Sequence, residues 1–127
     1  MKLAALVPDL FFATRIAEAA RSAGAPLTAL QGDLAAMLAT LRRDPPDVVV
    51  LDLTAPIALA LARAVRADPA LAGARLVGFY AHVDEPTRAA ALEAGVHDVL
   101  PKSAFTRRLP ELLSGAWRAG GKSFPGE

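Results

Sequence analysis

The sequence predicts an α/β domain in which helices cover both faces of a parallel β-sheet. Three observations support this fold class. Five short apolar runs alternate along the chain with five segments of helical periodicity. The apolar runs are continuous rather than alternating, which is typical of strands that are buried on both faces. Apolar residues make up 54% of the chain and charged residues 21%, as in a globular protein. Because crossovers between parallel strands are right-handed, this alternation predicts a doubly wound sheet.

The first part of the chain contains two predicted strand–helix units. Residues 3–7 form an apolar run that ends at Pro8, which predicts a buried strand. In residues 11–24 apolar side chains recur every four positions with polar side chains opposite, and a glycine is placed to end this helix. A weaker strand is predicted at residues 26–30. An amphipathic helix follows at residues 32–46, and two prolines end it.

The middle of the chain repeats the same alternation. Residues 47–51 give the clearest strand of the sequence, and residues 56–67 give the next helix. A fourth strand is predicted at residues 75–80. A short helix follows at residues 84–95, with Asp84 as its N-terminal cap.

The last elements lie after residue 95. Residues 96–100 form the fifth apolar run. Leucines with helical spacing predict a final helix beyond Lys102, with Pro110 in or near its first turn. The end of the chain, "AGGKSFPGE", has no periodicity. We therefore expect one domain over residues 1–118 and a flexible tail over residues 119–127.

Composition excludes several classes of protein. The absence of cysteine rules out disulfides, zinc–cysteine sites and cysteine nucleophiles, and it is compatible with the cytoplasm, where we expect the protein. Fourteen basic and thirteen acidic residues leave a formal charge of +1, so there is no electrostatic case for a nucleic-acid partner. Pro8 and Asp9 interrupt the N-terminal apolar run, which is too short to span a membrane.

Three charged residues each follow a predicted strand. Asp9 follows the first strand, Asp52 the third and Lys102 the fifth. In a sheet ordered 2-1-3-4-5, these strand ends lie close together at one edge, where such sheets bind ligands. Two neighbouring carboxylates repel unless a cation joins them, and Mg²⁺ prefers oxygen ligands. An aspartate can also accept a phosphoryl group whose charge a lysine balances. An aspartate after a strand is about as often only a cap.

Other candidate residues carry weaker signals. His82 and His97 lie near strand ends without a pair of carboxylates, so we interpret them as surface or hydrogen-bonded histidines rather than metal ligands. Four phenylalanines are expected in the core, namely Phe11, Phe12, Phe79 and Phe105. No glycine-rich phosphate loop is present.

Two segments carry a family resemblance. "PDVVVLDLTAP" and "ALEAGVHDVLPK" resemble the receiver domain of bacterial two-component response regulators, over residues 3–113. The resemblance implies a flavodoxin-like sheet with strand order 2-1-3-4-5. It also implies that Asp52 is the phosphoacceptor and that Lys102 contacts the phosphoryl group. Asp9, Asp52 and the backbone carbonyl of Thr54 would bind Mg²⁺.

Several positions depart from the family pattern. The family has two adjacent acids after the first strand, whereas this chain has Pro8 and Asp9. Tyr80 stands where the family has a small hydroxyl residue, and Val99 stands where it has the aromatic residue of the conformational switch. Ser103 replaces the proline that usually follows the lysine. The resemblance therefore implies a divergent member with weak Mg²⁺ binding at most.

Three functional hypotheses follow. The departures favour a stand-alone receiver-like (pseudo-receiver) signalling protein that acts through protein–protein interaction, with impaired or absent phosphorylation. The alternative is a functional single-domain response regulator, phosphorylated on Asp52 with Mg²⁺ by a histidine kinase. A small α/β enzyme is disfavoured because no nucleophile–base pair is evident, and we expect no enzymatic activity. The expected partner is a protein, either a histidine kinase or a downstream effector. No nucleic-acid or membrane partner is expected, and the sequence leaves open whether the protein forms a homodimer.

Overall fold

The computed structural model describes residues 1–81 and 84–115, in which strands alternate with helices. The strands are β1 (Leu3–Leu6), β2 (Leu27–Ala29), β3 (Val48–Asp52), β4 (Arg75–Tyr80) and β5 (Asp98–Pro101). The helices are α1 (Leu10–Ser22), α2 (Leu34–Arg43), α3 (Ala58–Ala67), α4 (Glu85–Glu93) and α5 (Lys102–Ser114), with a short 3-10 helix, η1 (Pro69–Leu71), before β4. All strand pairs are parallel, in the order β2-β1-β3-β4-β5. The predicted fold class and strand order are confirmed.

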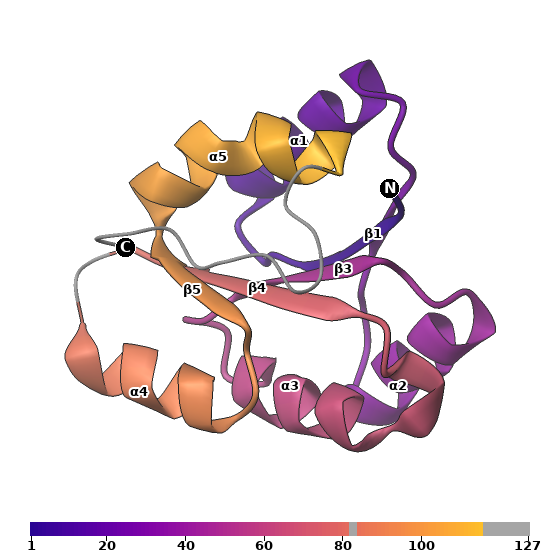
Figure 1. Ribbon diagram of the computed structural model, residues 1–127, viewed down its shortest axis with the longest axis vertical. Coiled ribbons are helices and arrows are strands. Elements are labelled where there is room, and N and C mark those ends of the chain that lie inside the picture. The colour runs from indigo at the N-terminus through magenta and orange to yellow at the C-terminus, as the bar shows by residue number, and fades with distance from the viewer. Residues whose placement is uncertain (82–83, 116–127) are drawn as a thin grey trace.

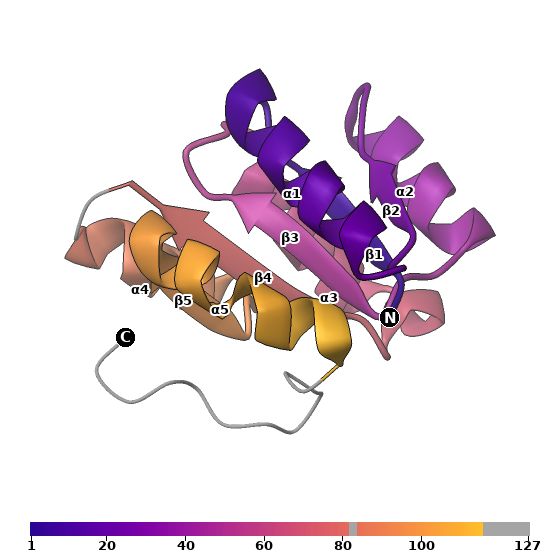
Figure 2. The same ribbon diagram turned by 90° about the horizontal axis from the view of Figure 1, so that it is seen from above.

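The sheet separates two layers of helices. Helices α1 and α5 cover one face, and α2, α3 and α4 cover the other (Figure 1). Viewed from above, α1 and α5 lie side by side across the sheet (Figure 2). The four apolar residues of β3, at positions 48–51, are at most 1% exposed, because this strand is covered on both faces. Each layer has its own hydrophobic core against the sheet.

Aspartates at helix N-termini explain several element boundaries. The side chains of Asp9, Asp33 and Asp84 accept hydrogen bonds from first-turn backbone N–H groups of α1, α2 and α4. Such caps satisfy donors that have no partner within the helix. The prediction of a cap at Asp84 is confirmed. At the other end of α4, Gly95 has φ of 100°, a left-handed conformation that favours glycine.

Two sequence expectations were wrong. Helix α5 begins at Lys102 itself, so Pro110 lies inside the helix and not near its first turn. The extended conformation of Pro101 allows the helix to start at the next residue. Phe11 is 89% exposed rather than in the core, because the adjacent Phe12 occupies the inward position of α1. The expected tail at residues 119–127 lies outside the described residues.

None of the helices in the described ranges is long and apolar enough to cross a membrane.

Candidate functional site

The three predicted site residues lie at the same edge of the sheet. Asp52 is the last residue of β3, Asp9 follows the neighbouring β1, and Lys102 directly follows β5. Because all strands are parallel, their carboxyl ends share one edge. Lys102 Nζ lies 3.8 Å from Asp9 Oδ2. The tertiary structure therefore brings Lys102 and Asp9 into direct contact, with Asp52 on the strand next to β1.

Asp9 contacts both the N-terminus of α1 and the side chain of Lys102. Its Oδ1 accepts hydrogen bonds from the backbone N–H groups of Phe11 at 3.0 Å and Phe12 at 3.3 Å. The positive end of the α1 dipole favours a carboxylate at this position. Its Oδ2 faces Lys102. Asp9 is therefore both a helix cap and a member of the charged site, so the two interpretations of this residue are compatible.

The ammonium group of Lys102 rests on an aromatic surface. Its Nζ lies 4.3 Å from the centroid of the Phe12 ring, within cation–π distance. The Phe12 ring contacts Phe79 edge-to-face, with centroids 5.0 Å apart, and Phe79 stacks on Phe105 at 5.0 Å. Lys102 is thus held between an aromatic cluster and Asp9. Since the side chains of this ion pair are 40% and 48% exposed, the pair contributes only about 0–1 kcal/mol.

Asp52 is buried and accepts two hydrogen bonds from Thr54. Asp52 is 9% exposed. Its Oδ1 accepts the Thr54 hydroxyl at 2.6 Å and the Thr54 backbone N–H at 3.0 Å. Such side-chain bonds to the residue two positions on stabilise turns. The Thr54 hydroxyl was not among the predicted site groups, which included only its carbonyl, although a threonine two residues after an aspartate is a recognisable turn signal.

Tyr80 and Val99 are buried on one face of the sheet. Tyr80 is 5% exposed and Val99 3%, and both belong to the core beneath α3 and α4. In the β4–β5 register Val99 pairs with Gly78, so Tyr80 lies two residues further along the same face. The burial of both positions fits a packed core at this end of the sheet. Their roles as atypical switch positions stay predictions.

Gly78, which was not among the predicted site residues, allows a close approach between β4 and the residue after β3. A Cβ atom at this residue would lie 2.8 Å from Leu53 Cδ2, so only glycine leaves room for the Leu53 side chain. Leu53 follows Asp52 directly and is itself buried. Gly78 therefore leaves room for the side chain of the residue that directly follows Asp52. A glycine inside a strand is the sequence signal for such a close approach.

The donor set suits a weakly held hard cation. Among residues 1–81 and 84–115, no group of three or more histidine, cysteine, aspartate or glutamate side chains could hold a metal ion. Asp9 and Asp52 supply two carboxylates, and one oxygen of each already accepts hydrogen bonds from the chain. Mg²⁺ commonly binds one or two carboxylates and completes its shell with water. These residues fit such an ion, with most of its coordination from solvent.

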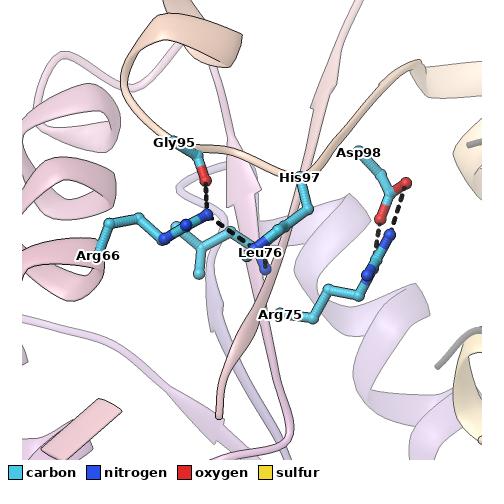
Figure 3. Close-up of polar contacts among 6 residues, drawn as sticks. All are labelled: Arg66, Arg75, Leu76, Gly95, His97 and Asp98. Carbon is cyan, nitrogen blue, oxygen red and sulfur yellow. Dashed lines mark hydrogen bonds and ion pairs between the residues drawn. The ribbon is translucent and has the colours of Figure 1, made fainter. Parts of the chain in front are cut away.

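A second polar cluster lies at the opposite end of β4 and β5 (Figure 3). His97 Nδ1 accepts the backbone N–H of Leu76 at 2.9 Å, and its Nε2 lies 2.7 Å from Arg66 Nη1. Burial, followed by the Arg66 charge, lowers the pKa of His97. His97 is thus a hydrogen-bonded histidine, as interpreted from the sequence, while His82 lies outside the described residues.

The same cluster contains a buried ion pair. Arg75 and Asp98 form a two-point contact, with Nε–Oδ2 at 2.8 Å and Nη2–Oδ1 at 3.3 Å (Figure 3). The two side chains are 9% and 1% exposed. This pair joins the amino ends of β4 and β5, far along the strands from Asp52, so its geometry indicates a structural role.

Comparison with known proteins identifies the fold through structure alone. No protein-family profile matches the sequence, and no curated protein of similar sequence was found. A protein from Chloroflexus aurantiacus J-10-fl described as a response regulator is 22% identical, with a TM-score of 0.74 over 89% of this chain and 97% of the other. The chemotaxis response regulator CheY4 of Vibrio cholerae is 17% identical, with a TM-score of 0.74 over 88% and 94%.

A third solved structure holds a metal ion. It is the receiver domain of the sensor histidine kinase PA1611 from Pseudomonas aeruginosa PAO1, with a magnesium ion coordinated in its active site cleft. It is 20% identical to this chain, with a TM-score of 0.71 over 88% of this chain and 96% of the other. The strand order, the acidic and basic residues at the carboxyl edge and these likenesses together show that the chain has the fold of response regulator receiver domains.

Proposed function

We propose that this chain is a receiver-like signalling domain that acts by binding another protein, with phosphorylation of Asp52 impaired or absent. One observation carries the proposal: each charged group of the site already has a partner in the chain. Thr54 donates to Asp52, the α1 N-terminus donates to Asp9, and Lys102 pairs with Asp9. A phosphoryl group gains less binding free energy in a site whose charges already have partners than in a site with unpaired charges.

Phosphorylation would require Asp52 to act as a nucleophile. One carboxylate oxygen attacks phosphorus, and an acyl phosphate forms as the bond from phosphorus to the leaving atom breaks; that atom is the imidazole nitrogen of a phosphohistidine or the ester oxygen of acetyl phosphate. Two hydrogen bonds to Oδ1 withdraw electron density from this carboxylate. The low exposure of Asp52 further restricts the approach of a phosphodonor. Both features slow the reaction.

Tyr80 adds a steric argument. The resemblance assigns this position to a small hydroxyl that contacts the phosphoryl group, and a phenol ring is much larger. Tyr80 shares a core and a face of the sheet with Val99. Our hypothesis is that the large residue at position 80 compensates for the small residue at position 99. The α4–β5 side of the domain would then keep one conformation and present a constant surface to a partner.

The proposed partner is a protein, either a histidine kinase or a downstream effector. The formal charge of +1 gives no case for nucleic acid. Within this proposal the domain spans residues 1–118, functions in the cytoplasm and is not an enzyme. Mg²⁺ would bind weakly through Asp9, Asp52 and the Thr54 carbonyl, where it would neutralise phosphoryl charge.

An ordinary phosphorylated receiver is the second candidate. It is favoured by the presence of Asp9, Asp52 and Lys102 at one edge of the sheet, since a carboxylate, a lysine and an oxygen-liganded cation are groups that take part in phosphoryl transfer. The magnesium ion in the P. aeruginosa receiver domain supports the same candidate. In that case a histidine kinase would supply the phosphoryl group.

Mass measurement after treatment with acetyl phosphate and Mg²⁺ separates the two candidates. We expect wild-type protein to gain little or no phosphoryl group. Tyr80→Thr, which restores a small hydroxyl, is expected to gain more. Asp52→Asn is the control, because it removes the nucleophile and leaves the backbone unchanged. Rapid gain of one phosphoryl group by the wild type, lost in Asp52→Asn, would establish the ordinary receiver instead.

A further inference from the structure

Phe12 contacts both members of the Asp9–Lys102 ion pair. Its backbone N–H donates to Asp9 Oδ1 at 3.3 Å, while the centroid of its ring lies 4.3 Å from Lys102 Nζ. The ion pair by itself holds Lys102 weakly, because Nζ and Asp9 Oδ2 are 3.8 Å apart and both side chains are partly exposed. The ring adds an attraction, since the face of an aromatic ring carries negative electrostatic potential. One residue thus orients the carboxylate and attracts the ammonium group.

Packing fixes the ring of Phe12 in place. Phe12 is 4% exposed, and its ring meets Phe79 and Phe105 edge-to-face, with centroids 5.0 Å and 6.0 Å away. Phe105 is three residues after Lys102 in α5, and Phe79 pairs with Asp52 in the β3–β4 register. The ring is therefore anchored both to the helix that carries Lys102 and to the strand beside Asp52. Because side chains in a protein core are close-packed, this ring is a rigid platform for the ammonium group.

Asp52 is the alternative carboxylate for Lys102. Side chains alternate between the two faces of a strand, and Val50 belongs to the same core as the three aromatic rings, so Asp52 lies on the face of the sheet that they cover. Strand β3 also lies between β1, which Asp9 follows, and β5, which Lys102 follows. In the described part of the chain, Lys102 forms an ion pair with Asp9 and none with Asp52.

We propose that Phe12 is a positioning residue, whose ring holds the Lys102 ammonium group at Asp9 and so withholds it from Asp52. A lysine side chain is long and flexible, so without the ring Lys102 is shared between the two carboxylates. Phosphoryl transfer to Asp52 brings in negative charge that a lysine can balance, and a lysine held at Asp9 balances less of it. This effect on phosphorylation rests on the proposed function, whereas the position of Lys102 can be measured independently of it.

The NMR signal of the methylene protons next to the Lys102 ammonium group tests the position. Protons above the face of an aromatic ring resonate upfield, and the protein has only three lysines, so Lys102→Met suffices to assign the signal. We expect an upfield signal in the wild type that Phe12→Leu moves to the ordinary lysine position. Phe105→Leu is the matched control, because it makes the same change in the same aromatic cluster but keeps the ring beneath Lys102. It should leave the signal upfield.

Asp52→Asn, made in two backgrounds, tests the choice of carboxylate. In the wild type we expect it to leave the Lys102 signal unchanged, since Lys102 lies at Asp9. In Phe12→Leu we expect it to shift the signal, because Lys102 then spends part of its time at Asp52. Phosphoryl gain from acetyl phosphate and Mg²⁺ should be roughly two- to fivefold faster in Phe12→Leu than in Phe105→Leu, the change in population that loss of an exposed cation–π contact produces.

The outcomes separate the position of Lys102 from the proposed function. An ordinary Lys102 signal in the folded wild type, or equal displacement by Phe12→Leu and Phe105→Leu, would overturn the positioning role. Equal phosphoryl gain in the two leucine variants, including none in either, would overturn its effect on phosphorylation. Rapid phosphoryl gain by the wild type would contradict the proposed function, while the Lys102 signal would still decide the position.

Far-UV circular dichroism establishes that each variant is folded. If a leucine variant does not fold, methionine replaces leucine at both positions, because its flexible side chain fills irregular space in a core without supplying an aromatic face. The same comparison of the Lys102 signal between positions 12 and 105 then applies.

Discussion

Thr54 donates two hydrogen bonds to one carboxylate oxygen of Asp52 at the end of β3, from its hydroxyl at 2.6 Å and from its backbone amide at 3.0 Å. The candidate nucleophile and its neighbour two residues on therefore satisfy each other. This relationship leads to the first prediction, because the hydroxyl can be removed without loss of the turn.

Thr54→Val should make Asp52 more reactive. Valine keeps the shape of the side chain but removes the hydroxyl donor, which leaves only the backbone N–H on Oδ1. We expect faster phosphoryl gain from acetyl phosphate than in the wild type, and a loss of about 0.5–1.5 kcal/mol in the free energy of unfolding. Thr54→Ser retains the donor and should behave like the wild type. Equal phosphorylation of the valine and serine variants would show that the hydroxyl does not limit the reaction.

Tyr80→Thr should destabilise the domain. The ring is 5% exposed, so its loss leaves a cavity in the core beneath α3 and α4. We expect the free energy of unfolding to fall by about 2–4 kcal/mol in a urea titration. Tyr80→Phe keeps the ring, so its free energy of unfolding should fall much less. A threonine variant as stable as the wild type would mean that the ring does not fill this core.

The buried ion pair between Arg75 and Asp98 gives a third prediction. Asp98→Asn leaves the Arg75 charge in a site where both side chains are less than a tenth exposed. Removal of one partner of a buried pair typically costs about 3–5 kcal/mol, which chemical denaturation can measure. The double variant Arg75→Met with Asp98→Leu should recover much of this loss. If the double variant were less stable than Asp98→Asn, charge burial would not be the cause.

His97 should make stability depend on pH. Its folded-state pKa is lowered, first by burial and then by Arg66 and Arg75, while Asp98 acts in the opposite direction. The unfolded chain, with a histidine pKa of about 6.5, then binds more protons than the folded chain. The contribution is therefore present above about pH 6.5 and is lost as the pH falls through the lowered pKa. A protonated Nδ1 also cannot accept the Leu76 N–H.

This effect can be measured from denaturation curves between pH 5 and pH 8. An ordinary histidine titrates roughly within this window. His97→Gln should flatten the dependence, since glutamine does not titrate. His82 is unchanged in this variant and provides the internal background. An unaltered slope in His97→Gln would assign the dependence to another group.

Magnesium should bind weakly. Pro8 replaces one acid that the receiver pattern has, and Asp9 and Asp52 each use one oxygen within the chain. Fewer free anionic oxygens reduce the affinity for a hard cation. A Mg²⁺ titration that follows the backbone shifts of Asp9 and Asp52 tests this, with Asp52→Asn as the control. Saturation at micromolar Mg²⁺ would contradict the prediction.

The sequence by itself determined the fold class and the edge at which the site lies. Continuous apolar runs specify strands buried on both faces, and helical periodicity between them specifies parallel crossovers. These patterns are local, so they can be recognised without knowledge of distant contacts. The strand order came from the family resemblance. With that order, Asp9, Asp52 and Lys102 had to share one edge, since parallel strands end on the same side.

The tertiary structure decided the side-chain contacts. The Arg75–Asp98 pair depends on the register of β4 and β5, and twenty-three positions separate the two residues. The exposure of Phe11 and the burial of Phe12 depend on how α1 rotates against the sheet. The start of α5 at Lys102 depends on the residue at which β5 ends. Each contact is set by packing between elements far apart in sequence, where local propensity carries no information.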